Sequence, residues 1–226
     1  MVILDTLLDI LFPRFCIGCG RFNTYLCKDC AKKIDFYESA LCPVCTKAIL
    51  PIGIHVGCKP HGYLDGLWSV AHFDGSIKKL IVQIKYSGRF AYIDTLIPLL
   101  YRFCPKSFRE ADLVTCVPMN PTKLRERGYN QSELLAKNFA AKLGKPFTPD
   151  LLKKTKKTLT QAHLKRSERL GNLEGAFTCT VKIRSKFTIL LIDDVVTTGS
   201  TLQECAKVLK KAGAGKVNAL TLAHGK

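Results

Sequence analysis

The chain has 226 residues, which suits one ordinary domain or a small module joined to a medium one. Its composition, 47% hydrophobic and 23% charged, is typical of a globular protein, and no apolar run approaches the roughly 20 residues of a membrane-spanning helix. With 35 basic and 18 acidic side chains the net charge is +17, which favours polyanionic partners.

Residues 1–12 are the first predicted element, a short amphipathic helix whose apolar face docks on a neighbouring module. Asp5 and Asp9 interrupt its apolar run, no basic segment precedes it, and no small-residue cleavage site follows it. These features argue against a secretory signal peptide, so we expect a cytoplasmic protein with no membrane span.

Closely spaced cysteine pairs follow this helix, and seven of the eleven cysteines lie before residue 60. A Cys-x2-Cys turn presents two thiolates to one ion while its backbone amides hydrogen-bond the sulfurs, and two such turns complete a tetrahedron. The pattern therefore predicts two structural zinc ions in a module of residues 1–63. The expected ligands are Cys16, Cys19, Cys27, Cys30, Cys42, Cys45, Cys58 and His61.

The spacing leaves open how the four turns share the two ions. The first two turns and the last two can each hold one ion, or the sites can be cross-braced. We expect His55 to be a loop residue and not a ligand. The four later cysteines stand singly in apolar segments and are expected to pack in a core: Cys104, Cys116, Cys179 and Cys205.

From residue 64 to residue 226 strand-like runs alternate with helical periodicity, which predicts an α/β domain with a mainly parallel sheet. Pro118 ends one strand and Gly144 follows one helix. The predicted strands are residues 67–73, 112–117, 187–192 and 217–222. The predicted helices cover residues 77–84, 128–143 and 200–212.

Residues 188–202 are the most informative segment. A buried strand delivers Asp193 and Asp194 at its C-terminal end, where open α/β sheets bind ligands. The hydroxyl-rich turn that follows opens a helix, so its backbone amides and hydroxyl groups can bind a phosphate. The two carboxylates are then placed to accept hydrogen bonds from vicinal sugar hydroxyls, either directly or beside a bound Mg²⁺.

This segment resembles the phosphoribosyl-pyrophosphate (PRPP) motif of type I phosphoribosyltransferases, in which an apolar strand, two acids and a Thr-Thr-Gly-x-Thr turn occur in that order. The resemblance implies that PRPP binds here with Mg²⁺ and that Asp193 and Asp194 are the catalytic acids. A P-loop is not supported, because no G-x4-G-K-[ST] occurs. The residues implied in PRPP binding are Asp193, Asp194, Val195, Val196, Thr197, Thr198, Gly199, Ser200 and Thr201.

A second candidate anion site, residues 117–131, directly follows a predicted strand and so lies at the same edge of the sheet. Arg125 and Arg127 can each form paired hydrogen bonds with phosphate oxygens, and Gly128 permits close backbone approach. Asn130 and Gln131 supply further donors. We expect these five residues to bind the pyrophosphate group.

Basic side chains are concentrated in residues 145–169, the lysine-rich segment. Such a concentration is typical of a surface that binds single-stranded nucleic acid and also of one that merely keeps a protein in solution. Aromatic residues beside cations can stack on bases or pack in the core: Tyr86, Phe90, Tyr92 and Tyr129. The expected DNA-binding residues are Lys153, Lys154, Lys156, Lys157, Lys165, Arg166 and Arg169.

The segment R-x-R-G-Y-N-Q, together with the cysteine pairs, resembles the ComF competence family, which joins a double zinc ribbon to a phosphoribosyltransferase-like domain. The K-Y-x-G-R element at residues 85–89 and the pattern at residues 161–177 also match that family. One departure is His61, where the family more often has cysteine. The resemblance implies a cytosolic protein that handles incoming single-stranded DNA in natural transformation, with a DNA-translocating helicase as partner.

Two functions from different classes remain. In the first, the chain binds PRPP with Mg²⁺ and single-stranded DNA during DNA uptake. In the second, it is an active phosphoribosyltransferase of nucleotide or nucleobase metabolism in which zinc is only structural. The sequence does not decide whether the chain is an enzyme, because no residue pair identifies an acceptor.

Overall fold

The computed structural model describes residues 13–58, 62–155, 173–183 and 186–225. The predicted amphipathic helix at residues 1–12 and most of the lysine-rich segment lie outside these ranges. Among the described residues, no helix has both the length and the apolar character needed to cross a membrane.

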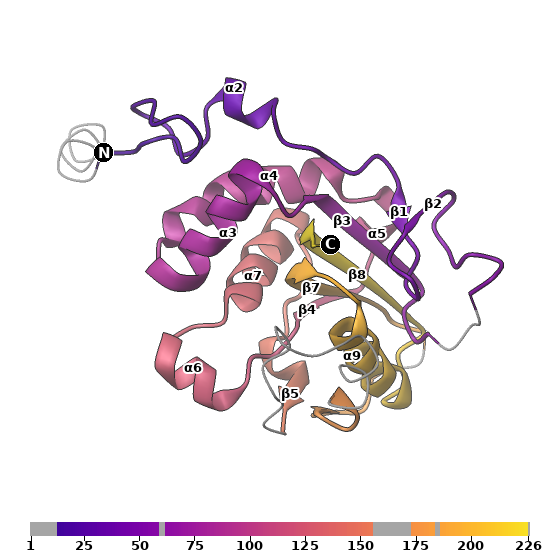
Figure 1. Ribbon diagram of the computed structural model, residues 1–226. Coiled ribbons are helices and arrows are strands. Elements are labelled where there is room, and N and C mark those ends of the chain that lie inside the picture. The colour runs from indigo at the N-terminus through magenta and orange to yellow at the C-terminus, as the bar shows by residue number, and fades with distance from the viewer. Residues whose placement is uncertain (1–12, 59–61, 156–172, 184–185, 226) are drawn as a thin grey trace.

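A six-stranded sheet forms the centre of the molecule (Figure 1). Four neighbouring strands are parallel, and a short antiparallel hairpin extends the sheet at one edge. The prediction of a mainly parallel α/β sheet is confirmed. In spatial order the strands are β2 (Ala48–Ile49), β1 (Ala40–Leu41), β3 (Gly66–His72), β8 (Lys216–His224), β7 (Thr188–Val196) and β4 (Leu113–Cys116).

Helices cover both faces of this sheet (Figure 1). On one face lie α3 (Gly75–Ser87), α4 (Ile93–Phe103) and α7 (Gln131–Leu143), and on the other lies α9 (Ser200–Lys211). Along β7 successive side chains alternate between the two cores, because a strand presents every second residue to the same face.

The remaining elements are short. They are α2 (Lys28–Ala31), η1 (Phe90–Tyr92), α5 (Lys106–Arg109), α6 (Pro121–Arg127), η2 (Pro149–Leu151), β5 (Leu152–Lys154) and β6 (Phe177–Cys179). Strands β5 and β6 form a separate antiparallel pair. The two strands lie on either side of residues 156–172, which the structure does not describe.

Two of the predicted boundaries that differ from the structure have identifiable reasons. The helix expected over residues 128–143 begins at Gln131, because Gly128 adopts the left-handed conformation (φ 82°) and Asn130 caps α7. The strand expected to end at residue 192 continues to Val196, because pairing with β8 persists as far as His224. Asp193 and Asp194 therefore lie within strand β7, near its C-terminal end, and not after it.

The cysteine-rich segment packs against the α/β domain. Strand β1 pairs with β3 through Leu41 and Leu67, so strands from both sides of residue 63 share one sheet. Nearer the N-terminus, the Tyr25 ring contacts that of Tyr92 with centroids 4.9 Å apart. Strands β1 and β2, before the proposed boundary at residue 63, therefore belong to the same sheet as the strands that follow it.

Three of the four single cysteines are buried, as predicted: Cys104, Cys116 and Cys205. Burial raises the pKa of Cys104 to about 12, so this thiol is unreactive at neutral pH. Cys179 is half-buried at the end of β6 and packs against the edge of the second core, and its Sγ lies 3.3 Å from the Val181 carbonyl oxygen.

Candidate functional site

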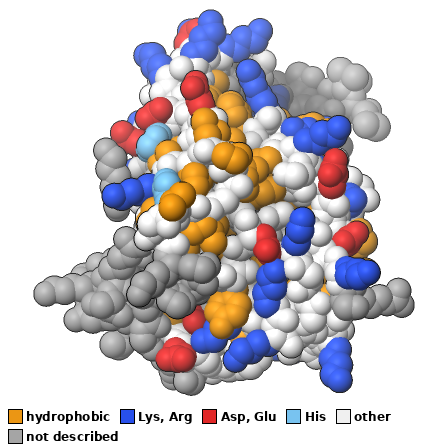
Figure 2. Space-filling model, turned by 90° about the vertical axis from the view of Figure 1, so that its right-hand side faces the viewer, with side chains coloured by type: hydrophobic (Ala, Val, Ile, Leu, Met, Phe, Trp, Pro, Cys, Tyr) orange, Lys and Arg blue, Asp and Glu red, His pale blue; other side chains and the backbone are white. Residues whose placement is uncertain are grey.

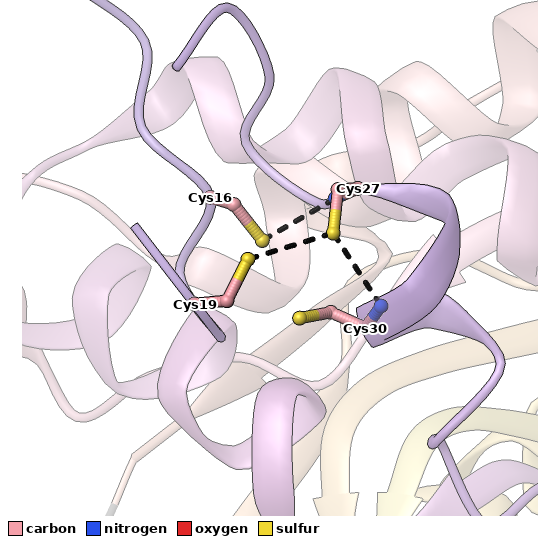
Figure 3. Close-up of side chains that lie close together, drawn as sticks. All are labelled: Cys16, Cys19, Cys27 and Cys30. Atoms are coloured by element: carbon pink, nitrogen blue, oxygen red, sulfur yellow. Dashed lines mark hydrogen bonds between the residues drawn. The ribbon is translucent and has the colours of Figure 1, made fainter. Parts of the chain in front are cut away.

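Four cysteines of the first two turns converge on one point (Figure 3). The sulfur atoms of Cys16, Cys19, Cys27 and Cys30 all lie within 4.8 Å of one another. The backbone N–H of Cys27 donates to Cys16 Sγ at 3.3 Å, and that of Cys30 to Cys27 Sγ at 3.5 Å. Four converging sulfurs with amide hydrogen bonds fit a closed, tetrahedral structural zinc site.

Glycine is required at position 18 of this cluster, because a Cβ atom there would lie 2.5 Å from Cys30 Sγ. Burial raises the pKa of Cys16, but hydrogen bonds from the backbone of Cys27, Cys19 and Gly18 outweigh it and lower the pKa to about 6. The loop is thus built to stabilise a thiolate, which is the form that binds metal.

The second cluster contains Cys42, Cys45, Cys58 and His55. His55 Nδ1 lies 3.3 Å from Cys45 Sγ, and its Nε2 lies 3.0 Å from the Ala48 carbonyl oxygen, which fixes the ring. The assignment of His55 as a loop residue without a ligand role was wrong. His61, the expected ligand, lies outside the described residues.

The pairing left open by the sequence is resolved by these two clusters. The first two turns share one site and the third turn shares the other with Cys58, so the sites are sequential and not cross-braced. Among the described residues, the imidazole of the second cluster is that of His55, which lies between the third turn and Cys58. Both ligand sets suit structural zinc.

Asp193 and Asp194 lie side by side near the C-terminal end of β7. Ser132 Oγ donates to Asp193 Oδ1 at 2.7 Å, and Gln131 Nε2 donates to Asp194 Oδ2 at 3.1 Å. Lys85 Nζ lies 3.8 Å from Asp194 Oδ2, and Asp194 is buried. Residues from α3, α7 and β7 therefore meet at this pair of acids.

Burial raises the pKa of Asp193 to about 7, and the neighbouring charge of Asp194 adds to the effect. The hydrogen bond from Ser132 and the ammonium of Lys85 act in the opposite direction. A carboxyl group with a pKa near 7 is present in both its protonated and its ionised form at neutral pH. The ionised form is the better ligand for a cation or a sugar hydroxyl.

The turn after β7 leads into the N-terminus of α9, as the motif predicts. Gly199 is the N-cap residue in the left-handed conformation (φ 74°). Thr198 Oγ1 and Ser200 Oγ are 2.9 Å apart, and Thr197 is exposed. Hydroxyl groups are thus concentrated at the positive end of a helix, where an anion is stabilised.

The candidate pyrophosphate residues divide into two groups. Arg125 and Gly128 are exposed and Arg127 is half-buried, so these three are open to a ligand. Asn130 is buried; its Nδ2 donates to the Val117 carbonyl at 2.9 Å and its Oδ1 accepts from the Ser132 N–H at 3.2 Å. Asn130 therefore holds α7 against the end of β4.

Gln131 joins this region to the acids. Arg127 Nη1 donates to Gln131 Oε1 at 2.7 Å, while the amide of Gln131 donates to Asp194. Lys85 completes the group, and sequence reasoning missed it as a site residue although it lies in the K-Y-x-G-R element. The sequence feature that points to Lys85 is helical spacing, which places this lysine in the last turn of α3, at the end of the helix near β7.

Part of the basic surface can be described. Lys153 is exposed, whereas burial lowers the pKa of Lys154, whose Nζ lies 5.4 Å from the Phe177 ring centroid. The other expected DNA-binding residues lie outside the described ranges: Lys156, Lys157, Lys165, Arg166 and Arg169.

The four aromatic residues differ in exposure. Tyr92 is buried in the core, and the hydroxyl group of Tyr129 donates to the Ile84 carbonyl. Tyr86 and Phe90 are 71% and 47% exposed, and the Arg127 guanidinium lies 5.4 Å from the Tyr86 ring centroid. Only Tyr86 and Phe90 therefore offer open ring surface beside cations.

Comparisons with known proteins agree with this architecture. The double zinc ribbon domain matches residues 7–59, and the phosphoribosyl transferase domain matches residues 130–226. The chain is 30% identical over 201 residues to the DNA utilization protein YhgH of Salmonella typhimurium, covering 85% of this chain and 87% of that protein. It is 29% identical over 227 residues to competence protein F of Haemophilus influenzae, covering 90% and 99%. The chain belongs to the ComF family.

A further ComF relative, competence protein ComFC of Streptococcus pneumoniae, is 29% identical over 203 residues and covers 88% of both chains. The first matched domain contains the described residues of both cysteine clusters, and the second contains the paired acids, the hydroxyl-rich turn and strands β7 and β8. The resemblance drawn from the sequence motifs is thereby confirmed.

Proposed function

We propose that this ComF family member binds PRPP with Mg²⁺ at the end of β7 and single-stranded DNA along its lysine-rich segment. It acts in the cytoplasm during DNA uptake in natural transformation, with a DNA-translocating helicase as partner. The observation that carries the proposal is the meeting of Asp193 and Asp194 with Lys85, directly before a hydroxyl-rich turn at a helix N-terminus.

The geometry supports separate binding sites for the three parts of PRPP. The turn from Thr197 to Thr201 binds the 5-phosphate, and the two acids accept hydrogen bonds from the ribose hydroxyls, directly or beside Mg²⁺. Arg125 and Arg127 bind the pyrophosphate, which lies on the β4 side of β7. When bound, Mg²⁺ supplies positive charge to the pyrophosphate oxygens.

Calorimetric titration of PRPP with Mg²⁺ into the wild type and an Asp193→Asn/Asp194→Asn variant tests this site. We expect binding to the wild type and at least a hundredfold weaker binding to the variant, because hydrogen bonds to charged groups contribute about 1.5–3 kcal/mol each. The matched control is Asp94→Asn, which changes an exposed aspartate on α4. Equal affinity in wild type and double variant contradicts the proposal.

The DNA-binding part rests on charge, since the net charge of +17 is concentrated in the C-terminal module. Each phosphate contact on a single strand contributes about −0.7 to the slope of log affinity against log salt. Replacing Lys153, Lys154, Lys156 and Lys157 by glutamine should therefore flatten the slope. Replacing the exposed Lys79 and Lys106 is the control. An unchanged slope in the first variant removes this segment from DNA binding.

A second candidate function, a phosphoribosyltransferase of nucleotide or nucleobase metabolism with purely structural zinc, is favoured by one observation. A cavity of about 850 Å³ borders the phosphate-binding turn. Release of pyrophosphate from PRPP that depends on an added acceptor, in the absence of DNA, supports this function. Release that depends only on DNA contradicts it.

A further inference from the structure

The third cysteine turn, Cys42–Cys45, lies in the loop of the β1–β2 hairpin, and this hairpin belongs to the central sheet. The side of the molecule that carries the hairpin in Figure 1 faces the viewer in Figure 2, where hydrophobic side chains gather next to histidines. Residues of the hairpin loop and of the turn from Thr197 to Thr201 line one cavity of about 850 Å³. The second cysteine cluster and the turn after β7 are therefore neighbours.

Thr46 and Pro43 approach the middle of the turn after β7. A Cβ atom added to Gly199 would lie 3.3 Å from Thr46 Cγ2 and 3.7 Å from the Pro43 carbonyl oxygen. Gly199 is the N-cap of α9, so the methyl group of Thr46 packs where the turn meets the helix. Because Thr46 is itself buried, its methyl group leaves the turn little room to move.

The conformation of Thr46 depends in turn on the cysteine ligands. Its φ of 58° is unusual for a β-branched residue and persists only where neighbouring groups hold it. The Thr46 N–H donates to the Cys42 carbonyl and Thr46 Oγ1 donates to the Cys45 carbonyl, both at 2.8 Å. When bound, zinc keeps these two cysteines in place and so maintains the conformation of Thr46.

Tyr37 contacts the start of the same turn indirectly, from the segment before the hairpin. Its hydroxyl oxygen lies 3.1 Å from His72 Nδ1 and 2.7 Å from His224 Nδ1. The His224 ring also forms a hydrogen bond with the backbone of Thr197, the first residue of the turn. Tyr37 therefore acts on the turn through His224.

Gln203 joins the helix that follows the turn to the second cluster. Its Nε2 donates to the Pro43 carbonyl at 2.7 Å, and its Oε1 accepts from the Tyr63 N–H at 2.7 Å. The start of the turn, its middle and the helix after it therefore all contact the segment that forms the second cluster.

The first cysteine cluster packs on other elements. A Cβ atom added to Gly18 would lie 3.0 Å from Ser76 Oγ on α3, and the Tyr25 ring contacts that of Tyr92 in η1. The two clusters thus differ in their position relative to the turn after β7, which makes the first cluster a matched comparison for the second.

We propose that the second cysteine cluster holds the turn from Thr197 to Thr201 in its PRPP-binding conformation, with Thr46 and Tyr37 as positioning residues, so that zinc and PRPP bind cooperatively. This inference rests on PRPP binding as proposed above. A turn that is already held in the bound conformation loses less conformational freedom when the phosphate binds. Because coupling between two sites is reciprocal, PRPP increases the zinc affinity of the second cluster by the same factor.

The first experiment compares the two clusters by calorimetric titration of PRPP with Mg²⁺ into Cys45→Ser and Cys19→Ser. Each variant removes one ligand from one cluster. Cys45→Ser should weaken PRPP binding about tenfold more than Cys19→Ser does, a typical size for coupling between sites. Hydrogen exchange in β7 and β8 checks that the sheet is folded in both variants. Equal PRPP affinities of the two variants overturn the proposal.

Thr46→Ser and Thr46→Val test the contact with every zinc ligand in place. Thr46→Ser removes the methyl group that packs on Gly199, and Thr46→Val keeps it. Loss of one buried methyl group should weaken PRPP binding about fourfold in Thr46→Ser. Thr46→Val should stay within about twofold of the wild type. Equal PRPP affinities of these two variants overturn the positioning role of Thr46.

The reciprocal effect separates positioning from a general loss of stability. Zinc affinity is measured by competition with a zinc-selective chelator, with and without PRPP and Mg²⁺. PRPP should raise the zinc affinity of Cys19→Ser, in which the second cluster is intact, about tenfold. It should raise that of Cys45→Ser, in which the first cluster is intact, by less than about twofold. An equal increase in both variants, or none in Cys19→Ser, overturns the cooperative binding.

Failure of this inference is distinguishable from failure of the proposed function. A wild type that does not bind PRPP contradicts the proposed function itself. A wild type that binds PRPP with the same affinity as Cys45→Ser contradicts only the role of the second cluster.

Discussion

At the scale of single residues, the site depends on a carboxyl group held in an unfavourable environment. Asp193 is placed beside Asp194 by consecutive positions on β7, and packing against α7 limits its access to water. Desolvation and like charge both favour the protonated form, which explains the pKa of about 7. Such a group lowers stability when it ionises, and strongly shifted pKa values of this kind are concentrated at functional sites.

Asp193→Asn should change how stability depends on pH. The pKa of Asp193 is raised from 3.8 to about 7 on folding, so between these values the folded state holds more protons than the unfolded state. Stability therefore falls as the pH rises through this range, and the variant should lack this part of the fall. Urea midpoints at about pH 5 and about pH 8 measure it. With Glu110→Gln as control, an unaltered pH dependence in Asp193→Asn contradicts the assignment.

Gly199→Ala should destabilise the fold by about 1–2 kcal/mol, the usual cost of the left-handed conformation for a residue with a Cβ. The residue has φ 74°, and an added Cβ would lie 3.3 Å from Thr46 Cγ2. The free energy of unfolding in urea measures the effect. Gly53→Ala, at a position without a positive φ, is the control and should cost less. Equal stability of the two variants contradicts the prediction.

At the scale of elements, helix α9 connects the phosphate-binding turn to the second cysteine cluster. Gln203 Nε2 donates to the Pro43 carbonyl at 2.7 Å, and its Oε1 accepts from the Tyr63 N–H at 2.7 Å. Pro43 lies within the Cys42–Cys45 turn, so one side chain of the helix contacts the cluster and the segment that leaves it. The zinc-ribbon segment is thus anchored to the element that begins at the phosphate site.

Gln203→Ala should lower the free energy of unfolding by about 1–2 kcal/mol, because two hydrogen bonds are lost. It should also speed amide hydrogen exchange at residues 42–46 and 63–64, which the side chain holds. Hydrogen exchange followed by mass spectrometry measures this local effect. Lys211→Ala, an exposed change at the end of the same helix, should leave exchange in these segments unchanged. Equal exchange rates at residues 42–46 and 63–64 in Gln203→Ala and Lys211→Ala contradict the anchoring role.

At the scale of the whole molecule, the first cysteine cluster and the parallel sheet differ in what stabilises them. The parallel strands from β3 to β4 have two continuous cores, one on each face of the sheet. Among the residues that the structure describes, the first cysteine cluster has a small buried group, formed by Cys16, Cys27 and Cys30 with Leu26 beside it. Its fold therefore depends on the metal to a degree that the sheet does not.

Removal of zinc by a strong chelator should unfold residues before about Tyr63 and leave the later sheet folded. Hydrogen exchange with and without chelator measures this, and protection should be lost in both cysteine clusters but kept in β7 and β8. Equal loss of protection in β7 and β8 at the same chelator concentration contradicts the division at residue 63. Re-addition of zinc is the control and should restore the original pattern.

Local patterns in the sequence determined much of this protein. Seven cysteine ligands follow from the Cys-x2-Cys pattern and Cys58, and the paired acids with the hydroxyl-rich turn follow from one strand and one helix start. The main strands of the sheet also follow from apolar runs. These features depend on residues close together in the chain, so spacing alone is sufficient to predict them.

Only the tertiary structure decided which distant residues meet. The choice of His55 as a ligand depends on how a loop folds back, and the approach of Lys85 to Asp194 depends on how α3 packs on the sheet. The cluster of Tyr37, His72 and His224 joins residues up to 187 positions apart. Such contacts are set by strand order and packing, which bring together side chains whose separation in sequence carries no periodic signal.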